Sequence, residues 1–333
     1  MTNNPHQIQR SKKPIRVGLA VVFAALNIEE QKAVEDVWAI AGQHSKSWKP
    51  SFAHYGIAPI PGEGQDIDLL VYLGESSRFA IVAEKLSRKV PVVFVKSTVE
   101  ELLEIPPGFA KRYRMSTGVN GIAQALASSA PEAPTVDWTT LPWPANLQEK
   151  MHLEEAEQRY MEKSLTAFRI ATNRRNISWQ KGLPKTGPFS VFLTMHDPLA
   201  ALLADTALKL WPQCTPIAAD GMSSIRSPEG ESWPERLIRV RHWTAHSHST
   251  SNLLYRQISG GQSIPDFDSP GMLFGTLNFI DKAASAGFGS EELENAGRHP
   301  GPLGLIRMMP SGQPNPERVI IFHGQKWSVV PVK

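Results

Sequence analysis

Cysteine is nearly absent from this chain, since Cys214 is the single cysteine among 333 residues. One cysteine excludes an internal disulfide framework and is typical of a reducing compartment, so we expect a cytoplasmic protein. The residues around it, Trp211, Pro212 and Pro216, offer no histidine or lysine to activate a thiolate. This setting favours a buried, inert thiol over a nucleophile.

Long apolar runs are missing as well. No stretch reaches the roughly 18 to 20 apolar residues that a membrane-spanning helix needs, so we expect no membrane partner. Residues 17–26 follow several basic residues and therefore resemble the start of a secretory signal. The same run also suits a buried first strand, which is the interpretation we favour.

The sequence lacks the motifs that identify several classes of function. The first apolar run continues into Phe23-Ala24-Ala25-Leu26, without the G-x-G-x-x-G fingerprint of dinucleotide binding, and there is no Walker A sequence. The G-x-S-x-G elbow of many serine hydrolases is absent too. No basic stripe with interleaved aromatic residues occurs, so we expect no nucleic-acid partner.

The chain does contain a regular alternation of strand and helix signals. A length of 333 residues with 41% hydrophobic and 20% charged residues suits two globular domains. In the first part, strands are expected at 15–23, 51–57, 68–73, 90–95 and 112–116, and helices at 28–41, after Ser77, after Thr98 and at 119–127. The strands near Ile15, Leu69, Val92 and Arg114 should form one parallel sheet, because a helical segment joins each to the next.

The second part repeats this alternation after a Pro/Trp-rich connector. A long amphipathic helix is expected at 145–172. Further strands are expected at 189–193, 216–219, 237–243, 303–309, 319–322 and 327–332, and further helices at 199–210, 251–258 and 272–286.

The sequence therefore predicts an α/β protein with two Rossmann-like, doubly wound lobes, the first with a parallel sheet. The expected divisions are a disordered leader at 1–13, a flavodoxin- or Rossmann-like domain at 14–130, a connector with a long bracing helix at 131–185, and a second α/β domain with C-terminal strands at 186–333.

A candidate ligand site follows the third expected strand, at Gly74-Glu75-Ser76-Ser77. Backbone N–H groups and the helix dipole at such a strand-to-helix junction favour an anion. The serines would equally serve as ordinary helix N-caps.

Three histidines in seven residues, His242, His246 and His248, form a candidate metal site. In an extended segment their side chains share one side, where imidazoles could bind zinc, manganese or iron, or hold a polar ligand. Their spacing matches no zinc-finger pattern, and a solvated loop is the alternative.

Four further residues are candidates for catalysis: His196, Asp197, Asp220 and Asp268. His196 and Asp197 follow the strand at 189–193, and the carboxylates could act as general bases or as metal ligands. Asp197 before Pro198, and Asp268 before a helix, are also natural caps. Loops that follow successive strands gather at one edge of such folds.

From these residues we interpret the protein as an enzyme acting on a small polar substrate, such as a sugar or hydroxy acid. The chemistry would be proton transfer of the isomerase or lyase type, with a divalent metal as an open option. One alternative is a non-catalytic sensor or binding protein that closes two α/β lobes over a small molecule. Another is an NAD(P)-dependent oxidoreductase with a degenerate phosphate loop. The expected partner is a small-molecule ligand, and self-association is left open.

Overall fold

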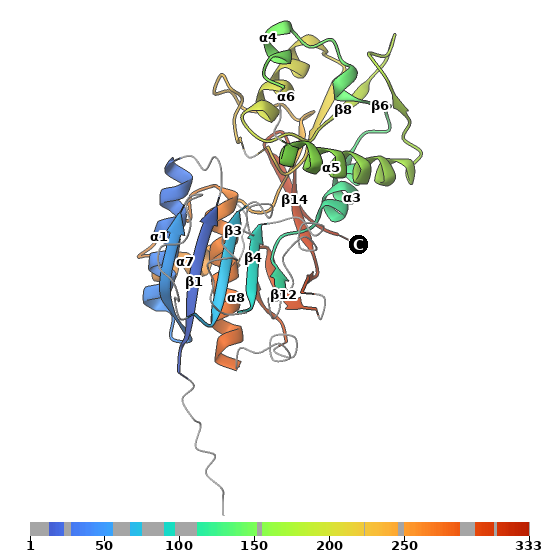
Figure 1. The fold of residues 1–333 in the computed structure, drawn as a ribbon. Coiled ribbons are helices and arrows are strands. Elements are labelled where there is room, and N and C mark those ends of the chain that lie inside the picture. The colour runs from blue at the N-terminus through green and yellow to red at the C-terminus, as the bar shows by residue number, and fades with distance from the viewer. Residues whose placement is uncertain are drawn as a thin grey trace, which may run out of the picture.

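The computed structural model describes residues 13–22, 28–55, 67–74, 90–96, 112–151, 155–222, 224–245, 250–286, 297–309 and 312–332. The chain forms two lobes, one above the other in Figure 1, and each lobe contains one large sheet. The predicted class, two doubly wound α/β lobes, is confirmed. The predicted leader lies outside the described residues except for Lys13.

The sheet of the first lobe is entirely parallel, with the strand order β2-β1-β3-β4-β5. Its strands are β1 (Ile15–Val22), β2 (Trp48–Tyr55), β3 (Leu69–Gly74), β4 (Val92–Lys96) and β5 (Arg112–Arg114). The prediction that the strands near Ile15, Leu69, Val92 and Arg114 share one parallel sheet is confirmed. The first part of the run at 17–26 belongs to the inner strand β1, whose residues 17–22 are all buried.

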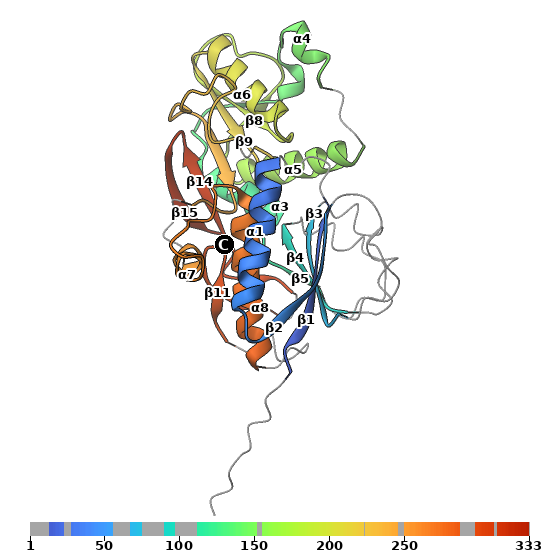
Figure 2. The same cartoon turned by 90° about the vertical axis from the view of Figure 1, so that its left-hand side faces the viewer.

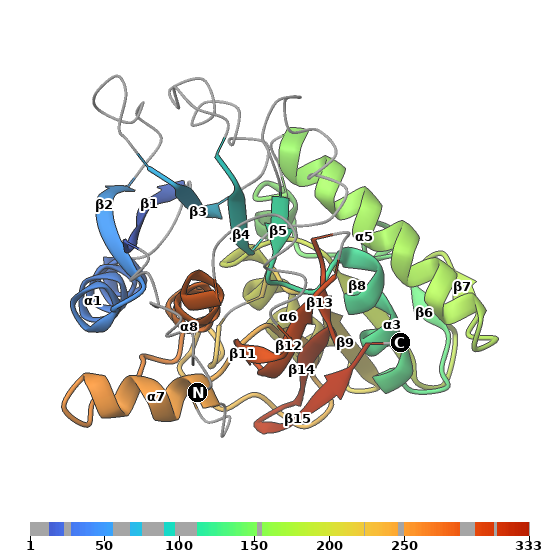
Figure 3. The same ribbon diagram turned by 90° about the horizontal axis from the view of Figure 1, so that it is seen from below.

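Two helices from distant parts of the sequence cover one face of this sheet. α1 (Ile28–His44) lies beside α8 (Asp268–Ala286), and both lie beneath the row of strands in Figure 3. Val34 and Val37 of α1 share a hydrophobic core with Leu277 and Ile280 of α8 and with the strands. α7 (Thr250–Ile258) packs on the outer side of both helices, as Figure 2 also shows.

The second sheet has the order β15-β14-β10-β9-β8-β6-β7. Its strands are β6 (Thr135–Val136), β7 (Trp179–Gln180), β8 (Phe189–Leu193), β9 (Cys214–Ala218), β10 (Ile238–Arg241), β14 (Arg318–His323) and β15 (Lys326–Pro331). The neighbouring strands β7, β6, β8, β9 and β10 pair in parallel. β14 pairs antiparallel with β10 on one side and with β15 on the other. α6 (Leu199–Leu210) covers one face, and α3 (Val119–Ser129) and α5 (Glu155–Asn173) cover the other.

The lobes do not follow the division expected from the sequence. α3, expected at the end of the first domain, packs against α5, β10 and β14 of the second lobe. The expected connector supplies β6 and β7 to the second sheet, and the expected long helix is divided into α4 (Ala145–Gln148) and α5. α7 and α8 return to the first lobe, because the apolar face of α8 completes the core beside α1.

The chain passes between the lobes three times. It leaves the first lobe after β5, returns after β10, and enters the second lobe again before β14. Before this last passage, β11 (His299–Gly301), β12 (Gly304–Met308) and β13 (Pro314–Asn315) form a small antiparallel sheet beside α8. Three connections therefore join the lobes at one junction.

Replacing Val93 with aspartate should unfold the first lobe. Val93 is fully buried in β4, in the core that α8 shares, and a carboxylate there has no cation to pair with it among the residues of that core. We expect a loss on the order of 3 kcal/mol or more in the free energy of unfolding, measured by urea denaturation. Ala53→Asp, on an exposed position of β2, is the control and should change the midpoint little. A Val93→Asp protein as stable as the control would contradict the burial of β4.

Cys214 should be chemically silent in the folded protein. Its side chain is fully buried at the start of β9, and burial raises the pKa of the thiol to about 12. Since the thiolate is the reactive species, iodoacetamide at pH 8 should label the protein only after unfolding in guanidinium chloride. Mass spectrometry of native and unfolded samples measures this difference. Fast alkylation of the native protein would show that the thiol is accessible.

Candidate functional site

The loops that follow β8, β9 and β10 meet at one edge of the second sheet, because these strands are parallel and adjacent. His196 follows β8, Asp220 follows β9, and His242 follows β10. The sequence marked all three residues as site candidates, and the structure brings them together.

Asp220 is the centre of this group. Its Oδ2 atom lies 3.1 Å from His242 Nε2, and its Oδ1 atom accepts a hydrogen bond from the hydroxyl of Tyr160. The Tyr160 ring is stacked on the imidazole of His196, with 5.2 Å between the ring centroids and 28° between the planes. We call Tyr160, His196, Asp220 and His242 the edge cluster.

Solvent exposure decreases through the edge cluster from His196 to His242. His196 is exposed, Tyr160 is partly buried, and the side chains of Asp220 and His242 are 11% and 2% exposed. The cluster therefore reaches from the surface of the second lobe to the buried start of the second passage between the lobes.

Sequence reasoning missed Tyr160. It lies in α5, sixty positions before Asp220, and helix periodicity alone does not tell which residue of α5 will meet the strand ends. The available signal was a tyrosine among charged residues near the start of a helix, which is too common to single out.

The Asp197 side chain makes hydrogen bonds within the second lobe. Its carboxylate accepts hydrogen bonds from the backbone N–H of Ala201 at 3.2 Å, and from the N–H and hydroxyl of Ser224 at 2.7 and 2.8 Å. The N-cap of α6 is Pro198 rather than Asp197 itself, and the contacts of Asp197 fix the first turn of α6 and the loop after β9.

Asp268 and Asp266 hold the second passage between the lobes. Asp268, the first residue of α8, accepts hydrogen bonds from Arg241 Nε at 3.1 Å and from the N–H groups of His242 and Trp243 at 3.2 Å. We call this pair of aspartates the acid clamp. It attaches the end of β10 to the start of α8, so the contacts of Asp268 are structural.

Asp266 completes the acid clamp. It accepts hydrogen bonds from the Thr244 hydroxyl and the Ala245 N–H at 2.8 Å, and one of its oxygens lies 3.4 Å from Arg241 Nη1. Burial by itself lowers the pKa of Arg241, but Asp268 and Asp266 raise it by more, so the guanidinium stays charged.

Arg239, two positions earlier on the same strand, has a different environment. It is fully buried, its guanidinium lies 4.6 Å from the Phe322 ring, and it donates to the Ser224 carbonyl. Burial, and then the charge of Arg241, lower its pKa to about 10.

Trp243 fills the space beside the acid clamp. Its side chain is fully buried against Gly271 of α8, and a Cβ atom added at Gly271 would overlap the indole ring. Glycine at this position is therefore required for the close approach of the passage to α8.

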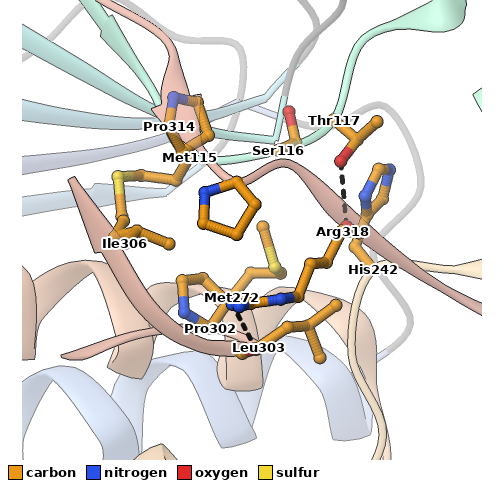
Figure 4. Close-up of a pocket in the computed structure, with 11 residues that line it drawn as sticks. Met115, Ser116, Thr117, His242, Met272, Pro302, Leu303, Ile306, Pro314 and Arg318 are labelled. Atoms are coloured by element: carbon orange, nitrogen blue, oxygen red, sulfur yellow. Dashed lines mark hydrogen bonds between the residues drawn. The ribbon is translucent and has the colours of Figure 1, made fainter. Parts of the chain in front are cut away.

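A small cavity of about 20 Å³ lies where the three passages meet (Figure 4). It is lined by Met115, Ser116, Thr117, His242, Met272, Pro302, Leu303, Ile306, Pro314, Pro316 and Arg318. The Thr117 hydroxyl donates to the Arg318 carbonyl at 2.9 Å, and Arg318 Nη1 donates to the Leu303 carbonyl at 3.1 Å. A cavity of this size holds about one water molecule, so the side chains at the junction of the three passages are closely packed.

The parallel strands of the first lobe also end on the side that faces the second lobe. β1, β3 and β4 point toward the second lobe (Figure 1). Gly74 ends β3, and a Cβ atom there would overlap the Val22 carbonyl oxygen, so glycine lets the ends of β1 and β3 approach. Glu75, Ser76 and Ser77, the rest of the predicted ligand site, lie outside the described residues.

The predicted metal site is described only at His242, since His246 and His248 lie outside the described residues. Among the residues that the structure describes, no group of three or more histidine, cysteine, aspartate or glutamate side chains is arranged to hold a metal ion. In the same part of the chain, no helix is both long enough and apolar enough to span a membrane.

Neither a protein-family model nor a curated protein sequence matches this chain. Solved structures do match it over nearly its whole length. A leucine-binding protein from Thermotoga maritima is 13% identical with a TM-score of 0.62, and the match covers 96% of this chain and 99% of that protein. The shared fold is that of two-lobed substrate-binding proteins. An ABC transporter substrate-binding protein from Desulfitobacterium hafniense is 12% identical with a TM-score of 0.62, and 95% of this chain and 100% of that protein are covered.

A further similar structure is a solute-binding protein of an ABC transporter from Rhodopseudomonas palustris in complex with p-hydroxybenzoic acid. It is 12% identical with a TM-score of 0.63, and the match covers 96% of this chain and 98% of that protein. At such low identity these likenesses concern the fold.

The interpretation of this protein as an isomerase or lyase, assisted by a metal, is wrong. The solved structures named above, which match nearly the whole chain, are a leucine-binding protein and substrate- and solute-binding proteins of ABC transporters rather than isomerases or lyases. Of the four residues chosen as catalytic, Asp197 and Asp268 make structural hydrogen bonds, whereas His196 and Asp220 belong to the edge cluster.

Replacing Asp268 with asparagine should loosen the junction. Arg241 is 1% exposed and would lose the charge of its nearest partner, so we expect the free energy of unfolding to fall by about 3 kcal/mol in guanidinium chloride titrations. Asp205→Asn, which breaks the exposed pair with Lys209, is the matched control and should have little effect. Equal stability of the two variants would show that the acid clamp does not hold the junction.

Proposed function

We propose that this protein binds a small molecule between its two lobes and releases it unchanged. The observation that carries the proposal is the edge cluster, which places aromatic, imidazole and carboxylate groups at the strand ends beside the hinge. Open α/β sheets bind ligands at the carboxyl ends of their strands. Two such edges on either side of a hinge form a site that closing would complete.

In this proposal, the protein recognises its ligand by closing the two lobes around it. A ligand that touches both edges binds the closed arrangement better than the open one and shifts the population toward it. The three passages supply the hinge, and the acid clamp keeps the second passage attached to α8 during rotation. Each lobe can then move as a rigid body on its own core.

The ligand in this proposal is a small organic acid. The similar structures named above include a leucine-binding protein and a protein in complex with p-hydroxybenzoic acid, and both ligands carry a carboxylate. We retain Gly74, Glu75, Ser76 and Ser77 as the proposed position for that carboxylate, because the sequence predicts a strand-to-helix junction there and such a junction favours an anion.

The proposal also bears on partners. A substrate-binding role would bring this protein to the membrane components of a transporter, in contrast to the sequence-based expectation of no membrane partner. The cytoplasmic location expected from the single cysteine stays a prediction, as does self-association.

A panel of small acids should raise the melting temperature of the purified protein. Leucine, isoleucine, p-hydroxybenzoate and 3,4-dihydroxybenzoate are the first compounds to measure by differential scanning fluorimetry. A ligand present at a hundred times its Kd stabilises the folded state by about 2.7 kcal/mol, enough for a shift of several degrees.

His196→Ala should reduce that shift, since His196 is the exposed member of the edge cluster, whereas His44→Ala, at the exposed end of α1, should leave it unchanged. Small-angle scattering should show a more compact protein in the presence of the active compound. Catalytic conversion of a bound compound, followed by NMR, would contradict the proposal.

A further inference from the structure

We infer that the ligand of this protein carries an aromatic ring, and that this ring stacks on the imidazole of His196. The inference rests on the proposed function and narrows its ligand class from small organic acids to aromatic acids. It follows from the way in which the edge cluster holds the His196 ring at the surface of the second lobe.

The Tyr160 ring supports one face of the His196 imidazole. The ring centroids are 5.2 Å apart and the planes differ by 28°, which is a stacked rather than an edge-to-face arrangement. Among the residues that the structure describes, Tyr160 is the only ring stacked on His196, and His196 itself is exposed. The stack therefore ends at the surface, where a further ring can extend it.

The Tyr160 ring is itself held in place. Its hydroxyl donates to Asp220 Oδ1, and Oδ2 of the same carboxylate lies 3.1 Å from Nε2 of the buried His242. The backbone N–H of His242 donates to Asp268 at the start of α8, over 3.2 Å. A chain of contacts thus runs from α8 to the ring beneath His196, and this ring keeps its orientation when a ligand arrives.

The loop after β9 borders another side of the imidazole. A Cβ atom at Gly221 would lie 3.0 Å from His196 Nδ1 and 2.7 Å from the Met195 carbonyl oxygen, so glycine allows this close approach. The Gly221 carbonyl also accepts a hydrogen bond from the Asp197 N–H at 3.1 Å, which ties the loop to the end of β8. The orientation of the imidazole is therefore set before a ligand binds.

An imidazole presented in this way favours an aromatic ring over a saturated one. Burial of apolar area alone does not, because an aromatic and a saturated ring of the same size remove similar areas from water. Stacked aromatic pairs contribute more than their buried area, and a saturated ring has no π system with which to stack. A preference for the aromatic member of a matched pair of acids is therefore the signature of the stack.

The test compares acids that differ in the saturation of the ring. The pairs are benzoate with cyclohexanecarboxylate, and p-hydroxybenzoate with trans-4-hydroxycyclohexanecarboxylate. Both members of a pair present the same carboxylate to the rest of the site. Isothermal titration of the whole chain should give a Kd for each aromatic acid that is about fivefold lower than the Kd for its saturated partner.

Two substitutions of His196 make the test specific for this ring. His196→Leu keeps an apolar side chain but has no π system, so the ratio of the two Kd values should fall to about one. His196→Phe restores an aromatic ring and should retain the preference. His44→Leu, at the exposed end of α1, is the matched control and should leave the ratio unchanged.

The outcomes separate the inference from the proposed function. If the saturated acids bind as tightly as the aromatic ones, or if only leucine or isoleucine binds, the inference is wrong and the proposed binding function stands. A preference that persists in His196→Leu would overturn the role given to His196. If none of the four acids binds and none in the wider panel raises the melting temperature, both the inference and the proposed function fall.

Discussion

Arg241 lies in the last parallel strand of the second lobe, and its guanidinium is 1% exposed, so its charge has to be balanced inside the protein. Asp268, 2% exposed and placed at the first turn of α8, provides that balance together with Asp266. Since β10 belongs to one lobe and α8 packs on the sheet of the other, one buried ion pair joins the two halves of the molecule. The placement of Trp243 and His242 follows from it, because their backbone N–H groups are held by the same carboxylate.

This arrangement also explains why the edge cluster can be both rigid and accessible. Its inner member, His242, is fixed through its backbone by the acid clamp and through its ring by Asp220. Its outer member, His196, is supported by a stacked ring and reaches the surface. If the proposed function is right, preorganised groups of this kind would lose little entropy on binding a ligand, and the binding free energy would be available for closing the lobes.

Features of the fold and of the candidate site that depend on local sequence could be predicted. The apolar, β-branched run at 90–95 predicts a buried parallel strand, and the positions of His196, Asp220 and His242 after strands predict one edge. The division into lobes was beyond such reasoning, because the apolar face of α8 fits either sheet and only tertiary packing selects the first. Tyr160 was missed for the same reason, and strand ends by themselves do not distinguish binding from catalysis.

The three passages between the lobes have a consequence for how the protein is made. β1 and α1 leave the ribosome early, yet their core is completed by α8, which begins more than two hundred residues later. Until then the apolar side chains of α1 and of the central strands have no permanent cover, and closing so long a loop is slow. The second lobe is also completed late, because its strands β14 and β15 follow α8 in the chain. Neither lobe can therefore complete its core until segments far along the chain have been synthesised, and a chaperone that shields the first sheet during this interval would favour correct folding.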